Sequence, residues 1–139
     1  MLEILLPCLT KNIYIEEIDL AANQLDDHSG KAAATIVQAH QEAKDHFVWQ
    51  YGLRNEKPPI FKMQSLKRLD LSHNKFTNKT MFDFSKVIKS DTYLRCFNFR
   101  ANEFDEEAIK EFHDAMKGNL SIFNLDLRDN PGLTQKLHR

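Results

Sequence analysis

One nine-residue phrase recurs four times along the chain, and this recurrence limits the possible folds more than any other feature. Each copy has apolar residues at its first, fourth and sixth positions and asparagine at its ninth. The last three asparagines are spaced 28 residues apart. Such self-similarity is typical of an array of stacked units that share one core. The copies are Ile15–Asn23, Leu66–Asn74, Leu94–Asn102 and Ile122–Asn130.

Each phrase predicts a short strand followed by a turn. Side chains alternate across a strand, so positions four and six point to one face and positions three, five and seven to the other. The apolar face is the core, and we expect the strands to stack in parallel, about 4.8 Å apart. The side chains of the closing asparagines are expected to bond to backbone groups of the next coil, which a buried turn would otherwise leave unpaired. These asparagines are Asn23, Asn74, Asn102 and Asn130.

Helical sequence fills the remainder of each period. After Asn102, Asp105 can cap a helix and Gly118 can end it, with apolar residues at helical spacing between them. The segment 80–89 repeats this pattern, and a longer helical pattern runs from about residue 29 to 47. We therefore expect one helix between successive strands.

A 28-residue unit of strand plus helix resembles the ribonuclease-inhibitor type of leucine-rich repeat, and the resemblance covers nearly the whole chain. It implies an α/β solenoid with short parallel strands on the concave side and helices on the convex side. We predict a single domain over residues 1–139, with strand phrases near 15–25, 66–76, 94–104 and 122–133. Both ends of the sequence look like interrupted repeats, so a partial array is expected that could self-associate through uncapped ends.

The interval from Asn23 to Asn74 is 51 residues, which is 23 longer than the regular period. This excess predicts an insertion at about residues 48–64. Trp49 and Tyr51 fall within it. They either pack a long loop against the convex side or form a protruding recognition loop, and the sequence leaves both readings open.

The layout of the insertion is similar to one in a family of centrosomal leucine-rich repeat proteins. An aromatic residue, a Leu-Arg pair and a basic, proline-containing stretch are matched here by Trp49, Leu53-Arg54 and Lys57-Pro58-Pro59. Members of that family support cilium assembly through protein contacts. The resemblance implies a cytoplasmic protein at the centrosome or ciliary base, with centrosomal or ciliary components as partners.

The odd positions of the phrases predict a concave, protein-binding surface. Carboxylates recur at position five, and stacked like charges repel unless cations answer them. Arg100 and Arg128, at position seven, can neutralise them locally, but position seven offers no cation for Asp19 and Asp70. The row is either a solvated face with internal pairing or the site of a partner with a basic or hydrogen-bonding segment. The candidates are Glu17, Asp19, Arg68, Asp70, Asn98, Arg100, Asp126 and Arg128, together with Trp49 and Tyr51 of the insertion.

The sequence predicts no catalytic, cofactor or metal site. The six histidines form no H-E-x-x-H motif, and no glycine-rich phosphate loop occurs. A net charge of −1 argues against nucleic acid as a partner, and the apolar stretch near residue 4 is too short to enter a membrane as a spanning helix. Cys8 and Cys96 form no C-x-x-C motif and are expected to be free thiols.

These observations favour a non-enzymatic protein-protein interaction module. The alternatives are a cytosolic leucine-rich repeat regulator of the immune-sensor or actin-capping type and, less favoured, an enzyme subunit. A flanking nucleotide-binding domain or actin-binding helix would point to one of the regulators.

Overall fold

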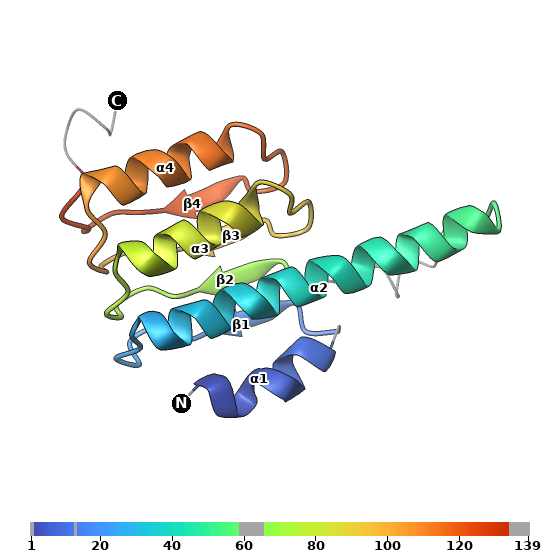
Figure 1. The fold of residues 1–139 in the computed structure, drawn as a ribbon, viewed down its shortest axis with the longest axis horizontal. Coiled ribbons are helices and arrows are strands. Elements are labelled where there is room, and N and C mark those ends of the chain that lie inside the picture. Colours follow the sequence, from blue (N-terminus) through green and yellow to red (C-terminus); the bar gives the residue numbers. More distant parts are fainter. Residues whose placement is uncertain (1, 13, 59–65, 134–139) are drawn as a thin grey trace.

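The computed structural model describes residues 2–12, 14–58 and 66–133. Helices and short strands alternate along the chain, and Figure 1 shows the strands side by side in one layer and the helices in another. The elements are α1 (Leu2–Lys11), β1 (Glu17–Asp19), α2 (Asp27–Leu53), β2 (Arg68–Asp70), α3 (Asn78–Ile88), β3 (Cys96–Asn98), α4 (Glu106–Met116) and β4 (Asn124–Asp126).

The strands form one parallel sheet in the order β1-β2-β3-β4. Ile18 pairs with Leu69, Leu69 with Phe97, and Phe97 with Leu125. All four residues occupy position four of their phrases, so the alignment of the repeats in the sequence is also the pairing register of the sheet. The predicted α/β solenoid of leucine-rich repeats is confirmed.

Positions four and six point into the core, as the alternation of strand side chains predicts. Leu71, Phe97 and Phe99 are almost completely buried. The ring of Phe84, on α3, lies 5.0 Å from that of Phe97 and 5.1 Å from that of Phe99, nearly perpendicular to both. Such edge-to-face pairs contribute about 0.5–1.5 kcal/mol each beyond area burial. Aromatic contacts therefore join the helix of one coil to the strand of the next.

Repeat asparagines tie neighbouring coils together. The Asn102 Oδ1 accepts hydrogen bonds from the N–H groups of Asn74 (3.2 Å) and Phe76 (3.3 Å), and its Nδ2 donates to the Leu71 carbonyl (3.0 Å). Asn74 and Asn130 make the equivalent bonds. These bonds run to the preceding coil, not to the next coil as expected, because the N–H groups of the preceding turn point toward the asparagine.

Asn23 differs from the other three repeat asparagines. It is exposed, and within the described part of the chain its side chain bonds only to the Ala21 carbonyl of its own turn (3.1 Å). The prediction of an inter-coil bond from its side chain is therefore wrong for Asn23. Its backbone N–H still donates to the Asn74 Oδ1 (3.0 Å), so this turn is held by the asparagine that follows.

The residue before each repeat asparagine adopts a left-handed backbone conformation. The φ angles are 58° at Ala22, 55° at His73, 57° at Ala101 and 61° at Asp129. A non-glycine residue in this region costs about 1 kcal/mol or more. The hydrogen bonds of the following asparagine offset that cost and hold the turn in this shape.

A second set of polar contacts joins the starts of successive helices. The Asp27 carboxylate, in the first turn of α2, accepts hydrogen bonds from the Thr77 N–H (2.8 Å), the Thr77 hydroxyl and the Thr80 hydroxyl (2.8 Å). The Thr77 side chain makes no capping bond of its own to α3. Asn78 likewise accepts from the Asp105 N–H at the start of α4 (3.0 Å). Each helix start is thus fixed by the helix before it.

The long interval between the first two asparagines contains an extended helix. The sequence predicts the end of this helix near residue 47 and a looped insertion from about residue 48, but α2 continues to Leu53. The rings of Phe47 and Tyr51 pack one turn apart at 4.9 Å and support the added turns. Figure 1 shows this end of α2 projecting beyond the other helices. Residues 59–64 of the expected insertion lie outside the described residues.

The fourth coil accommodates a proline directly after its asparagine. In the second and third coils, the equivalent residues Lys75 and Glu103 donate backbone hydrogen bonds to the preceding coil (2.7 and 2.9 Å). Pro131 has no N–H to donate. Gly132 makes the bond instead, to the Phe104 carbonyl (2.8 Å), so the contact is kept with a shift of one residue.

Candidate protein-binding surface

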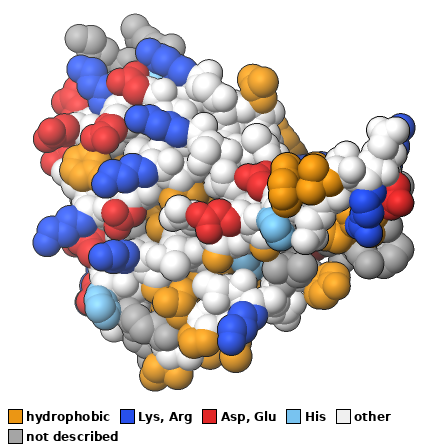
Figure 2. Space-filling model, turned by 45° about the vertical axis from the view of Figure 1, so that its right-hand side comes forward, with side chains coloured by type: hydrophobic (Ala, Val, Ile, Leu, Met, Phe, Trp, Pro, Cys, Tyr) orange, Lys and Arg blue, Asp and Glu red, His pale blue; other side chains and the backbone are white. Residues whose placement is uncertain are grey.

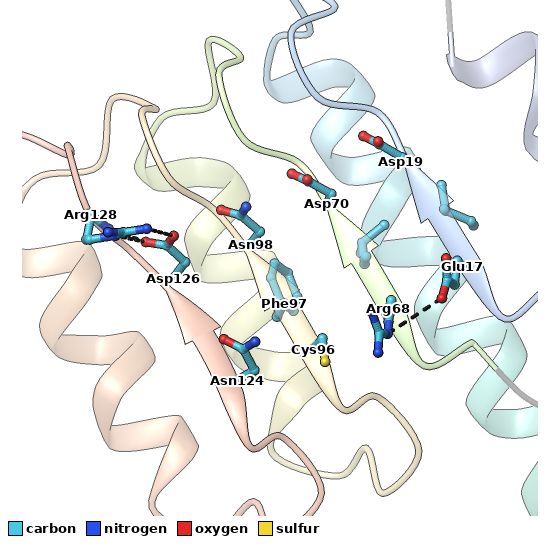
Figure 3. A pocket seen from close by; sticks show the side chains of 12 residues that line it. Glu17, Asp19, Arg68, Asp70, Cys96, Phe97, Asn98, Asn124, Asp126 and Arg128 are labelled. Atoms are coloured by element: carbon cyan, nitrogen blue, oxygen red, sulfur yellow. Dashed lines mark hydrogen bonds and ion pairs between the residues drawn. The ribbon is translucent and has the colours of Figure 1, made fainter.

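The odd positions of the phrases lie side by side on the concave face of the sheet. They line an open hollow of about 460 Å³, shown in Figure 3. The sheet therefore groups the candidate residues in the rows that the sequence predicted. Position three gives Glu17, Arg68, Cys96 and Asn124, and position five gives Asp19, Asp70, Asn98 and Asp126.

Position five has a structural role that the sequence reading missed. The side-chain oxygen of each residue in this row accepts a hydrogen bond from the backbone N–H two residues later, at 2.9–3.0 Å. The bond stabilises the turn at the end of each strand, and only short side chains with a terminal oxygen make it readily. The recurrence of Asp and Asn in the row therefore has a local cause, separate from any partner.

Internal pairing neutralises the C-terminal half of the surface. Arg128 donates to both carboxylate oxygens of Asp126, at 3.0 and 2.8 Å. This hydrogen bonding lowers the pKa of the Asp126 carboxyl, against the opposing effect of burial. Arg100 forms no ion pair with the position-five row, although its charge also helps to lower the pKa of the Asp126 carboxyl, as expected of a cation near that row. Its Nε donates to Asp129 at 2.6 Å, because the turn before Asn130 brings that carboxylate beside it.

In the N-terminal half of the concave surface, two carboxylates have no neighbouring cation. The Arg68 Nε lies 3.6 Å from Glu17, which accounts for one carboxylate of the first two coils. Asp19 and Asp70 stand opposite each other in adjacent strands, and Figure 3 shows their side chains pointing the same way. Within residues 2–12, 14–58 and 66–133, neither has a lysine or arginine within ion-pair distance. In each of them Oδ1 accepts the turn hydrogen bond, and the second carboxylate oxygen accepts none from the described residues.

Trp49 and Tyr51 do not form one surface. Two residues along a helix are about 200° apart, so their side chains leave α2 on opposite sides. Trp49 is 59% exposed and stacks on His46, with ring centroids 5.8 Å apart. Tyr51 is half-buried against Phe47, and the Arg54 guanidinium lies 4.7 Å from its ring. Only Trp49 is open to a large contact.

Groups suited to catalysis or metal binding are sparse in the described residues. These residues contain no group of three or more His, Cys, Asp or Glu side chains placed to hold a metal ion. His40 is buried, with its Nε2 2.6 Å from the Leu9 carbonyl, so it joins α2 to α1. The Ser72 hydroxyl donates to Asp70 at 2.6 Å and supports the strand-end turn. No helix in the described part has the length and apolar character needed to cross a bilayer.

The parallel sheet, the asparagine ladder and the helical outer layer define a leucine-rich repeat fold. A family model described as Leucine Rich repeat matches residues 62–81. The chain is similar to Centrosomal protein of 78 kDa from Xenopus tropicalis, with 27% identity over 100 residues. The match covers 70% of this chain and 14% of that relative, so the chain spans only a small part of the relative's length.

The fold is also similar to the solved structure titled Leiomodin-1 Actin-Binding Site 2. The TM-score is 0.69 at 18% sequence identity, over 91% of this chain and 63% of that one. At this identity the likeness concerns the fold alone. It gives no support to the actin-capping alternative.

Proposed function

We propose that this chain is a non-enzymatic protein-protein interaction module that acts in a cytoplasmic scaffold at the centrosome or ciliary base and supports cilium assembly. Its concave face is the binding surface, through Glu17, Asp19, Arg68, Asp70, Asn98, Arg100, Asp126 and Arg128.

The observation that carries the proposal is the open hollow over the sheet. Most of its lining side chains are carboxylates, amides and guanidinium groups, with Ile18, Leu69, Cys96 and Phe97 between them, and this lining suits a polar protein segment better than an apolar small molecule. The unanswered carboxylates of Asp19 and Asp70 favour a partner that brings a basic or hydrogen-bonding group to the N-terminal half.

The similarity to Centrosomal protein of 78 kDa supports the cellular setting. That protein's name places it at the centrosome, and the similarity extends over most of this chain. Centrosomal or ciliary proteins are therefore the partners to test first.

The test is to express the tagged chain in ciliated cells and to follow its position and its bound centrosomal proteins. The double variant Asp19→Lys, Asp70→Lys should lose partners that the wild type retains, because it reverses the charge of the N-terminal half. Glu111→Lys, an exposed reversal on α4, is the matched control and should behave as wild type.

Blocking the hollow by size gives an independent check. Asn98→Trp fills the middle of position five and should also weaken binding, regardless of charge. If the charge variant and the blocking variant both keep every partner while circular dichroism shows a native fold, the concave face is not the binding surface.

A further inference from the structure

At its projecting end, α2 carries large apolar residues on the face opposite to the one that packs on the core. Its core face is given by Ile36 and His40, both buried, and continues through Phe47 and Tyr51. The opposite face begins with polar, exposed Gln38. A helix face turned to solvent is normally polar along its whole length. Here it changes to apolar residues at the projecting end.

On this outer face, a stripe of side chains runs along the helix. We call it the α2 stripe, and it consists of Glu42, His46, Trp49 and Leu53. Trp49 is 59% exposed and Leu53 is 68% exposed. Intervals of four, three and four residues are the spacing at which one helix packs along another. The stripe is about 16 Å long at 1.5 Å per residue, enough for about three turns of a second helix.

The stripe is held in place before any partner arrives. The His46 ring stacks on the Trp49 indole at an interplanar angle of 28°, which limits the rotation of the indole. At the base of the projecting end, the Tyr93 hydroxyl donates to Asp45 at 2.7 Å and ties α2 to the segment before β3. Figure 2, turned to bring this end forward, shows hydrophobic side chains among charged ones along it. A rigid aromatic anchor of this kind loses little entropy on binding.

The negative charge at the base of the stripe favours a partner that carries a cation. Glu42 and Asp45 are exposed carboxylates, and neither forms an ion pair with a lysine or arginine of the described segments. Glu42 and Lys86 both line a groove between α2 and α3, but they do not come within ion-pair distance of each other. A partner cation would therefore find uncompensated negative charge there.

We propose that the α2 stripe docks an amphipathic helix of a partner protein. The apolar a and d residues of that helix cover Trp49 and Leu53, and a lysine or arginine about two turns from the residue over Trp49 faces Glu42. This contact lies on a different surface from the concave face. Its test can therefore succeed or fail whatever the result for the proposed function.

Trp49 is the only tryptophan of the chain, so its fluorescence reports on this contact directly. The probe is a stapled helical peptide with leucine at the a and d positions and lysine at the flanking positions. A second peptide has glutamate in place of each lysine. The lysine peptide should cause a saturable blue shift of the emission and bind about tenfold more tightly than the glutamate peptide.

Variants of the chain separate the apolar and charged parts of the contact. Leu53→Ser should weaken binding of the lysine peptide about tenfold or more by removing one anchor. Glu42→Lys should invert the preference between the two peptides. Leu120→Ser is the matched control, since Leu120 is 98% exposed outside the stripe, and it should bind as wild type.

Three outcomes would overturn the proposal. Equal affinity for both peptides would mean unspecific apolar contact, and full binding by Leu53→Ser would place the contact elsewhere. An emission shift that depends on protein concentration without peptide, matched by dimers in ultracentrifugation, would assign the stripe to a second copy of the chain. Circular dichroism of each variant excludes unfolding as the cause of lost binding.

Discussion

Gly30 of α2 lies so close to Thr80 of α3 that no side chain fits between them. A Cβ at Gly30 would stand 2.1 Å from the Thr80 Oγ1. This close approach brings the two helices together at the point where Asp27 reaches the start of α3. The absence of a side chain at one position therefore permits the polar contact at another.

Gly30→Ala should destabilise the protein, although alanine is the better helix former. The added methyl forces α2 and α3 apart, and such overpacking costs about 1–3 kcal/mol. Gly52→Ala is the control within the same helix, because a Cβ there meets nothing within 4 Å. Gly52→Ala should be neutral or stabilising by up to about 1 kcal/mol. Thermal melts that rank the two variants in the opposite order would contradict the packing described for Gly30.

The Asp27 contact predicts a dependence of stability on pH. Burial by itself raises the pKa of the Asp27 carboxyl, but the hydrogen bonds from Thr77 and Thr80 outweigh it and leave the pKa below its usual value. A carboxylate with a depressed folded pKa stabilises the fold above its unfolded pKa, about 4, and this contribution is lost as the pH falls through the folded value. Asp27→Asn should cost about 1–2 kcal/mol at pH 7. Denaturant titrations should show the gap to wild type closing below pH 4, and a gap that stays constant would contradict the charge-assisted bond.

The asparagine ladder predicts unequal effects at equivalent sequence positions. Asn102→Ala leaves buried N–H and carbonyl groups of two coils without partners, so it should cost about 2–4 kcal/mol. Asn23→Ala removes a single exposed side-chain bond and should cost less than about 1 kcal/mol. Equal melting temperatures for the two variants would show that the ladder does not stabilise the array.

The buried strand positions predict a large effect of truncation. Leu71 is fully buried at position six of its phrase, and Leu71→Ala should cost about 2–5 kcal/mol through lost burial and the cavity left behind. Lys75→Ala, an exposed change four residues away, is the surface control. A shift in melting temperature for Leu71→Ala no larger than that of the control would be incompatible with this core.

The sequence by itself determined the repeat, the register and the faces of the strands. The spacing of Asn74, Asn102 and Asn130 aligned the coils, and the alternation around Leu69 separated core from concave surface. These features follow from local rules, because one strand residue pairs with its equivalent in the next coil and side chains alternate at a period of two. For the same reason, the sequence predicted which residues form the two rows on the concave face.

Only the tertiary structure decided which polar groups form hydrogen bonds and ion pairs with one another. The hydrogen bonds from Thr77 and Thr80 to Asp27, and the pairing of Arg100 with Asp129, join residues in different coils, and their partners depend on how the turns pack. A signal was present in the sequence, since Asp27 and Asn78 each stand four residues after a repeat asparagine.

The end of α2 is a local feature that the sequence left open. Residues 48–53 carry no proline and a single glycine, so local propensity permits either a helix or the start of a loop. Contacts of the helix with itself, through Phe47 and Tyr51, select the helix. That choice places Trp49 on the outer face and Tyr51 on the core side, a separation that residue spacing reveals only once the backbone is known to be helical.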